Sequence, residues 1–285
     1  MEYKEKEQNN TTVDQAWNRL HQWLEQDGLL PEANGDKQKT LSGIVFKSLS
    51  AAAVLAVCIF LGWYFTRLQV YDKELLILYN EANAPTLATM LEDGSVVYLS
   101  EETLLSFPDR FANDKREVVL QGEAFFNIKK QVERPFFIET DLARIEVTGT
   151  SFNVKSHTGD VFLLSVKEGE VCVTQKNRRQ VLSVKAGETV LFDSEQLQLA
   201  KNTIEFDDYF KQIHFKDENL KNVVNIINMH ADATFIKIDP KVETRTLTFT
   251  FSKNKNIEEI AEVICLALDL QHAQQDNTIY ISEKR

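Results

Sequence analysis

The side chains that most often do chemistry in proteins are scattered along this chain of 285 residues. Its histidines form neither an H-x-H pair nor an HExxH motif, and its cysteines form no CxxC pair. A GxSxG nucleophile motif and a paired-carboxylate motif are also absent from the sequence. We therefore predict a protein that is not an enzyme and that needs no metal or cofactor. The histidines are His21, His157, His214, His230 and His272.

Two short stretches deserve a chemical interpretation before they are set aside. Glu123 follows Gly122 and has no carboxylate or histidine neighbour in the sequence, so we expect it to cap a loop amide and not to act as a catalytic acid. The run from Gly149 to Asn153 resembles a phosphate-binding loop, but it lacks the Walker lysine and a following helix. It predicts a tight turn between strands, in which Asn153 bonds to the backbone.

The three cysteines leave two interpretations open. Cys58 lies in an apolar run, Cys172 in a strand pattern and Cys265 in a helix pattern. A disulfide between Cys172 and Cys265 fits an oxidising compartment. Two buried free thiols are the favoured interpretation, because unpaired cysteine usually behaves as a small apolar residue.

An uncharged run from Ser48 to Thr66, between Lys47 and Arg67, organises the rest of the chain. As a helix it is about 28 Å long, which matches the hydrocarbon core of a bilayer, about 30 Å thick. A buried core helix would normally show a polar face, and a cleaved signal peptide would begin near residue 1. We therefore predict a transmembrane helix over residues 47–67.

The flanking charges predict the orientation of this span. Basic residues close to a span favour the cytoplasmic side, and three lie upstream while two lie downstream. We expect a short cytoplasmic N-terminus and a long exported C-terminus. Most of the net charge of −11 lies after Arg67, which argues against a nucleic-acid partner for the exported part. The basic residues are Lys37, Lys39 and Lys47 upstream, and Arg67 and Lys73 downstream.

The cytoplasmic segment, residues 1–46, predicts one amphipathic helix. Thr12 and Gln15 have the spacing of a capping box, and Asp27-Gly28 is typical of a helix end. A piece of this size has difficulty building its own core. We favour docking of the helix into a groove on a cytoplasmic partner, while a position on the membrane surface or in a small oligomer stays open. The apolar stripe consists of Trp17, Leu20, Trp23 and Leu24.

After a linker over residues 68–86, the sequence predicts two exported domains. Short apolar segments separated by glycine and by Asp or Asn continue from 87 to 200, which indicates an all-β sandwich or roll. Asp93-Gly94 is a hairpin signal, and Gly122 separates the segments 118–120 and 124–128.

Residues 206–285 contain a strand–helix–strand order twice, with helices over 220–230 and 257–268. This arrangement predicts a small α+β domain with its helices on one face of a sheet.

A hundred residues carry a family resemblance in order: DGSVVYLSEETLLSFPDRF, REVVLQGEAFFNI, RPFFIET, IEVTGTSFNV, VKEGEV and AGETVLF. This region resembles the FecR family of membrane-bound anti-sigma regulators. Residues 206–285 resemble the C-terminal domain that often follows it in glycan-utilisation regulators, which is akin to the short signalling module of secretins and TonB-dependent receptors. The family order of cytoplasmic segment, span and periplasmic region matches the order derived from hydropathy.

The motif residues of this resemblance are expected to be structural. Glycines at turns or bulges supply positive φ or close backbone approach, and the aromatic residues are candidates for the core. The motif residues are Asp93, Gly94, Gly122, Glu123, Phe126, Pro135, Phe136, Gly149, Thr150, Phe152, Asn153 and Gly169.

The resemblance implies a single-pass anti-sigma factor of the inner membrane, with a cytoplasmic N-terminus, a periplasmic C-terminus and two partners. The stripe from Trp17 to Leu24 would bind an ECF-type sigma factor in the cytoplasm. The periplasmic region would detect the signalling domain of a TonB-dependent outer-membrane receptor. The alternative is a membrane-tethered periplasmic scaffold or adhesion module without signalling.

Overall fold

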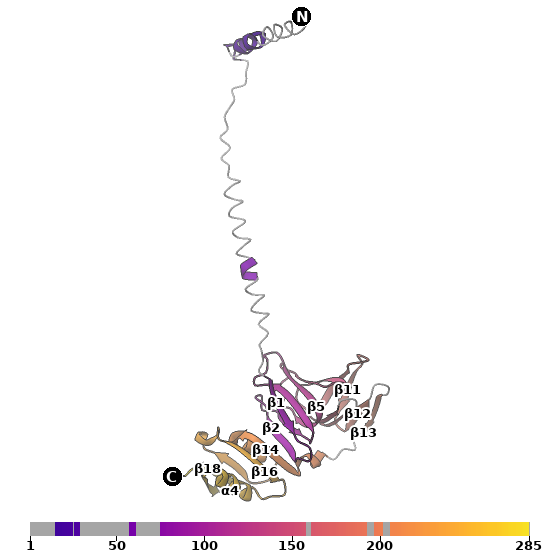
Figure 1. Ribbon diagram of the computed structural model, residues 1–285, viewed down its shortest axis with the longest axis vertical. Helices are drawn as coiled ribbons and strands as arrows, with labels where there is room; N and C mark the ends of the chain where they lie inside the picture. Colours follow the sequence, from indigo (N-terminus) through magenta and orange to yellow (C-terminus); the bar gives the residue numbers. More distant parts are fainter. Residues whose placement is uncertain are drawn as a thin grey trace. The chain divides into compact units, whose positions relative to one another are not determined.

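The computed structural model describes residues 15–24, 26–28, 57–60, 75–157, 161–192, 197–201 and 206–284 (Figure 1). The chain divides into two compact units, Met1–Val70 and Tyr71–Arg285. In the first unit, residues 15–24 and 57–60 are helical. The second unit holds the strands, and it is described here by itself.

The second unit begins with a β-rich region in which apolar side chains alternate with polar ones. β10, for example, has buried residues at every second position, as expected for a strand covered on one face. The strands are β1 (Leu75–Asn80), β2 (Thr86–Met90), β3 (Val96–Leu99), β4 (Thr103–Pro108), β5 (Arg116–Asn127), β6 (Phe136–Glu139), β7 (Ala143–Val147), β8 (Ser151–Ser156), β9 (Phe162–Glu168), β10 (Glu170–Gln175), β11 (Val181–Lys185), β12 (Glu188–Phe192) and β13 (Leu197–Lys201).

The C-terminal region has the mixed order of strands and helices that its sequence predicts. Asn219 and Asn256 cap the two α-helices, because their side chains accept hydrogen bonds from backbone amides of the first turn. The elements are η1 (Phe206–Phe210), β14 (Gln212–Asn219), α3 (Leu220–Met229), β15 (Phe235–Ile238), η2 (Pro240–Val242), β16 (Thr246–Ser252), α4 (Ile257–Leu268), β17 (Leu270–Gln275) and β18 (Thr278–Glu283).

Strand β5 joins two sheets. The first sheet has the order β1-β4-β5-β6-β7-β10-β11, and the second has the order β16-β14-β2-β3-β5-β8-β9-β12-β13. β5 changes sheet at Gly122, whose φ of +117° is a conformation that other residues rarely adopt. A Cβ atom at Gly122 would lie 2.8 Å from the Cα atom of Thr103. Glycine therefore allows both the bend of β5 and its close contact with β4.

The first core lies between these sheets and contains the predicted aromatic residues. Phe126 and Phe152 stack at 5.5 Å between ring centroids, and Phe162 and Phe192 stack at 4.5 Å. Phe136 is also fully buried, in edge contact with Phe126. The expectation that Phe126, Phe136 and Phe152 form core is confirmed.

A buried ion pair fastens the start of β5 to the turn between β2 and β3. Arg116 donates from Nη1 to Oδ2 of Asp93 at 2.6 Å, and both side chains are 0% exposed. Arg116 also donates to the carbonyl oxygens of Lys129 and Arg134, at 2.9 and 2.8 Å. Asp93 accepts two further hydrogen bonds from Ser95. One guanidinium thus ties three chain segments together.

A second core continues across the shared sheet into the C-terminal region. β14 pairs in parallel with β2, with His214 opposite Leu87. All four residues of β3 are buried, because Val97 points into the first core while Tyr98 points into the second. α3, α4 and η1 complete the second core. The β-rich and C-terminal regions therefore share one sheet.

The structure confirms a mostly β fold with an N-terminal helix and differs from the predictions in three respects. β1 lies within the predicted linker, residues 68–86, and β4 and β13 were also missed. The two segments predicted around Gly122 are one strand, since a glycine with positive φ bends β5 without ending it. β15, β18 and β17 form a separate three-stranded sheet. Because α3 and α4 contact strands of both sheets, the prediction that the helices lie on one face of one sheet was wrong.

We expect Arg116→Met to lower the free energy of unfolding of the 71–285 unit by about 3–5 kcal/mol, because it leaves Asp93 buried without its partner. Lys221→Met is the matched control, since it removes an exposed ion pair with Glu243 that contributes about 1 kcal/mol or less. Urea denaturation of both variants measures the difference. Equal losses in the two variants would contradict the role assigned to the buried pair.

Gly122→Ala should destabilise the same unit by about 1–3 kcal/mol more than Gly187→Ala, which is the typical cost of overpacking. Both glycines have positive φ, but a Cβ atom at Gly187 meets nothing within 4 Å. The Gly187→Ala control therefore measures the cost of backbone strain alone, whereas Gly122→Ala also introduces a steric clash with Thr103. Thermal melting followed by circular dichroism compares them, and a similar melting temperature for both would rule out the clash as a significant cost.

Candidate functional site

The predicted partner-binding stripe lies on a helix whose apolar side chains are exposed. In the first unit, residues 15–24 are helical, and Trp17, Leu20 and Trp23 are 61%, 44% and 56% exposed. Leu24 is half-buried. The predicted start of the helix at Thr12 lies outside the described residues. Two exposed tryptophans on a short helix are typical of a surface that another protein covers.

Of the predicted span, the structure describes residues 57–60, which are helical and have exposed apolar side chains. Among the described residues, no helix is long and apolar enough to cross a membrane. Ser48 and Thr66, the predicted ends of the span, lie outside the described residues. The span therefore stays a prediction.

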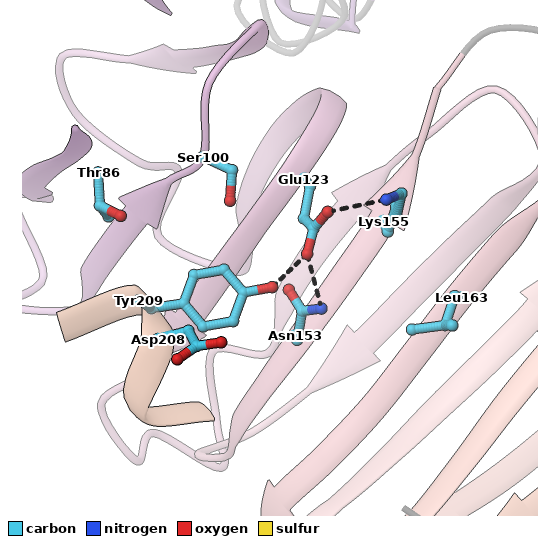
Figure 2. A pocket seen from close by; sticks show the side chains of 8 residues that line it. All are labelled: Thr86, Ser100, Glu123, Asn153, Lys155, Leu163, Asp208 and Tyr209. Atoms are coloured by element: carbon cyan, nitrogen blue, oxygen red, sulfur yellow. Dashed lines mark hydrogen bonds and ion pairs between the residues drawn. The ribbon is translucent and has the colours of Figure 1, made fainter. Parts of the chain in front are cut away.

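A polar cavity of about 420 Å³ opens between β5, β8 and η1 (Figure 2). At its centre, one carboxylate oxygen of Glu123 accepts hydrogen bonds from the hydroxyl of Tyr209 and, at 3.4 Å, from Nδ2 of Asn153. The other oxygen pairs with Lys155 at 3.2 Å. Burial and the charge of Glu123 raise the pKa of Tyr209, so its hydroxyl stays protonated and donates.

Two predictions about this cavity were wrong. The Glu123 side chain caps no loop amide, because it is directed from β5 toward Tyr209 and Lys155. Asn153 lies within β8 and bonds to a side chain instead of the backbone. Its Oδ1 atom is buried and has no hydrogen-bond partner. The cluster fastens η1, the first element of the C-terminal region, to the middle of β5.

A second polar contact joins the same two regions. The hydroxyl of Tyr98 on β3 forms a hydrogen bond of 2.8 Å with Nε2 of His230, which follows α3. The ring of Phe210 packs against both, at 5.0 Å from Tyr98 and 4.8 Å from His230. Burial and then the charges of Lys253 and Lys167 lower the pKa of His230 to about 4. The imidazole is therefore neutral at pH 7.

Cation–π contacts add to this junction. Nζ of Lys167 on β9 lies 5.9 Å from the ring centroids of Phe125 and Phe206, and 5.5 Å from that of Phe210. These rings come from β5 and η1. Such contacts contribute about 0.5–1 kcal/mol each where they are exposed.

The remaining motif residues hold the backbone in place. Gly94 and Gly169 have positive φ, while a Cβ atom at Gly149 would lie 2.5 Å from the Cα atom of Lys130. Thr150 donates to the carbonyl oxygen of Glu170 at 3.1 Å, next to Gly169. The carbonyl oxygen of Pro135 accepts from the backbone amide of Arg116 at 2.9 Å. All of these contacts involve backbone conformation, close approach of the backbone or backbone carbonyl oxygens.

The cysteines and histidines do not converge. Cys172 and Cys265 are free thiols, which excludes the disulfide, although Cys172 is half-buried and not fully buried as predicted. Within the described ranges, no group of three His, Cys, Asp or Glu side chains could hold a metal ion.

Sequence reasoning missed Arg116, Tyr98, Tyr209 and His230. Each acts through a partner that lies far away in the sequence, such as His230, which is 132 residues from Tyr98. For Arg116, the sequence offered one signal of a buried ion pair, which is a basic residue at the start of a strand rich in apolar residues.

Two family models match the chain in tandem. The model for "FecR protein" matches residues 82–172, and the model for "FecR, C-terminal" matches residues 212–281. Two crystal structures of a candidate anti-sigma factor from Parabacteroides distasonis are 23% identical to this chain, with a TM-score of 0.44. Each covers 74% of this chain and 100% of its own. No protein of curated function matches the sequence.

The contact between Tyr98 and His230 predicts a pH-dependent stability. In the unfolded chain His230 takes up a proton near its ordinary pKa of 6.5, whereas in the folded state burial lowers that pKa to about 4. Stability should therefore fall as the pH is lowered from 6.5 toward 4. Urea denaturation of the 71–285 unit at pH 7 and pH 5 measures this loss.

His230→Gln should show a smaller loss of stability between these two pH values, because glutamine takes up no proton. His272→Gln is the control, since His272 is exposed on β17. An unchanged pH dependence in His230→Gln would contradict the assignment.

Proposed function

Because the chain belongs to the FecR family, we propose that it is an anti-sigma factor, a single-pass regulatory protein of the inner membrane that is not an enzyme. Its cytoplasmic helix binds an ECF-type sigma factor. Its periplasmic region responds to the state of a TonB-dependent outer-membrane receptor. The protein thereby regulates transcription of the genes that the sigma factor serves.

The tandem family match, together with the exposed stripe at the other end of the chain, is the observation that carries this proposal. The matched regions, residues 82–172 and 212–281, both follow the predicted span, whereas the stripe precedes it. The helix over residues 15–24 leaves Trp17 and Trp23 exposed. A sigma factor that covers this stripe would bury both rings, which are typical anchors of protein interfaces.

The C-terminal region supplies a candidate surface for the receptor. Among the described strands, β15 and β17 are the edges of the three-stranded sheet, so each has one side on which a further strand can pair. Phe235 on β15 is exposed beside this edge. A receptor domain that adds a strand here would gain main-chain hydrogen bonds and one apolar contact.

A signal that crosses the membrane through a single helix is more easily carried by a change of association or by cleavage of the chain than by a rigid movement of the helix. A single helix has no neighbour in its own chain against which it can slide or rotate. The signal would then pass as release or retention of the cytoplasmic segment. This route is part of the proposal.

The double variant Trp17→Ala/Trp23→Ala should weaken sigma-factor binding by roughly 700-fold, because two buried tryptophan anchors that contribute about 2 kcal/mol each amount to about 4 kcal/mol, and every 1.4 kcal/mol is a factor of ten. The full chain in detergent, titrated with the ECF sigma factor of the same organism, measures the affinity. Asn18→Ala/Gln22→Ala is the matched control, since it changes polar residues of the same helix.

Undiminished capture by the tryptophan double variant would show that this helix is not the sigma-binding element. A transcription reporter assay distinguishes the anti-sigma factor from the remaining alternative. A periplasmic scaffold or adhesion module predicts that the same variant leaves transcription unchanged, whereas the anti-sigma factor predicts altered expression.

A further inference from the structure

An apolar patch lies on the outer face of the first sheet at its β1 edge. Antiparallel pairing places Ile77 opposite Ser106, and Ser106 opposite Val119, so their side chains share this face. On β1 and β5 the exposed fractions range from 46% at Val119 to 68% at Ile77, while Leu104 on β4 is half-buried. We call this surface the β1 patch, and it consists of Leu75, Ile77, Tyr79, Leu104 and Val119.

The middle strands of the same face carry charge, while Val181 on β11, at the opposite edge, is an exposed apolar residue. Glu117 and Glu139 both pair with Arg144, at 3.8 and 3.2 Å, and Glu139 also pairs with Lys176 at 3.0 Å. These residues lie on β5, β6 and β7 and on the turn after β10, next to the patch. Ion pairs of this kind suit a surface in water. Exposed apolar side chains therefore gather at the β1 edge, which indicates that something covers this edge.

The chain itself restricts what can cover the patch. β1 begins at Leu75, and the predicted span ends at Thr66, so the connector is residues 67–74. Eight residues reach at most about 28 Å when fully extended and about 12 Å as a helix. Leu75 thus lies close to the periplasmic surface of the membrane. This step rests on the span of the proposed function.

We infer that the β1 patch rests on the phospholipid bilayer that holds the predicted span. Leu75 and Ile77 enter the boundary between headgroups and acyl chains, where apolar side chains gain free energy by leaving water. Tyr79 suits the headgroup level, because its ring is apolar and its hydroxyl stays hydrated. The contact would hold the exported region in a fixed orientation above the membrane.

Photocrosslinking from single positions tests this contact. The full chain, with p-benzoylphenylalanine in place of Ile77, is reconstituted into vesicles of phosphatidylethanolamine and phosphatidylglycerol that contain an alkyne-tagged phospholipid. The control carries the probe in place of Val181, which is 61% exposed and lies on β11 at the opposite edge of the same sheet. We expect lipid labelling from position 77 to exceed that from position 181 by at least about fivefold.

Each outcome separates the occupants of the patch. Equal lipid labelling from both positions, or a crosslinked dimer as the main product from position 77, would overturn the inference, the latter in favour of a second copy. If the chain fails to float with the vesicles, the predicted span fails and the inference fails with it. Insertion without selective labelling overturns the membrane contact alone and leaves the proposed function intact.

Discussion

The buried ion pair between Asp93 and Arg116 is the interaction on which the β-rich region depends. A charge in a protein interior is costly unless a partner and hydrogen bonds replace its water, and here Nη1 and Nε of Arg116 have such partners, while its Nη2 is buried without one. The pair joins the β2–β3 turn to the first residue of β5 and to the segment that leads into β6. Since β5 belongs to both sheets, fixing its start positions the two layers against each other.

Because the second sheet is continuous, it joins the β-rich region and the C-terminal region of the 71–285 unit. β14 extends the sheet beside β2, and η1 is held to β5 by the contact of Tyr209 with Glu123. The junction combines a few polar contacts with aromatic packing around Phe125 and Phe210. A force that a partner applied to the C-terminal region would act directly on these contacts.

The surfaces proposed for function lie at separate places in the chain. The tryptophan stripe precedes the predicted span, and the β1 patch follows it. The strand edges of the three-stranded sheet lie near the C-terminus. This order suits a protein that passes a signal across a membrane, because each surface meets a different environment. The polar cavity beside Glu123 lies at the junction of the two regions and fastens them, which agrees with a regulatory protein.

The sequence by itself determined the elements whose causes are local. The strand and helix pattern after residue 206, the tryptophan stripe and the turn at Gly94 follow from periodicity, capping residues and glycine conformation, and the structure places them accordingly. Only the tertiary structure decided the rest. β1 became a strand because β4 pairs with it, and Glu123 and Asn153 were misassigned because their neighbours come from other elements of the fold. The partners of Arg116 and His230 are likewise distant in sequence, and periodicity within one segment carries no information about which segments meet in space.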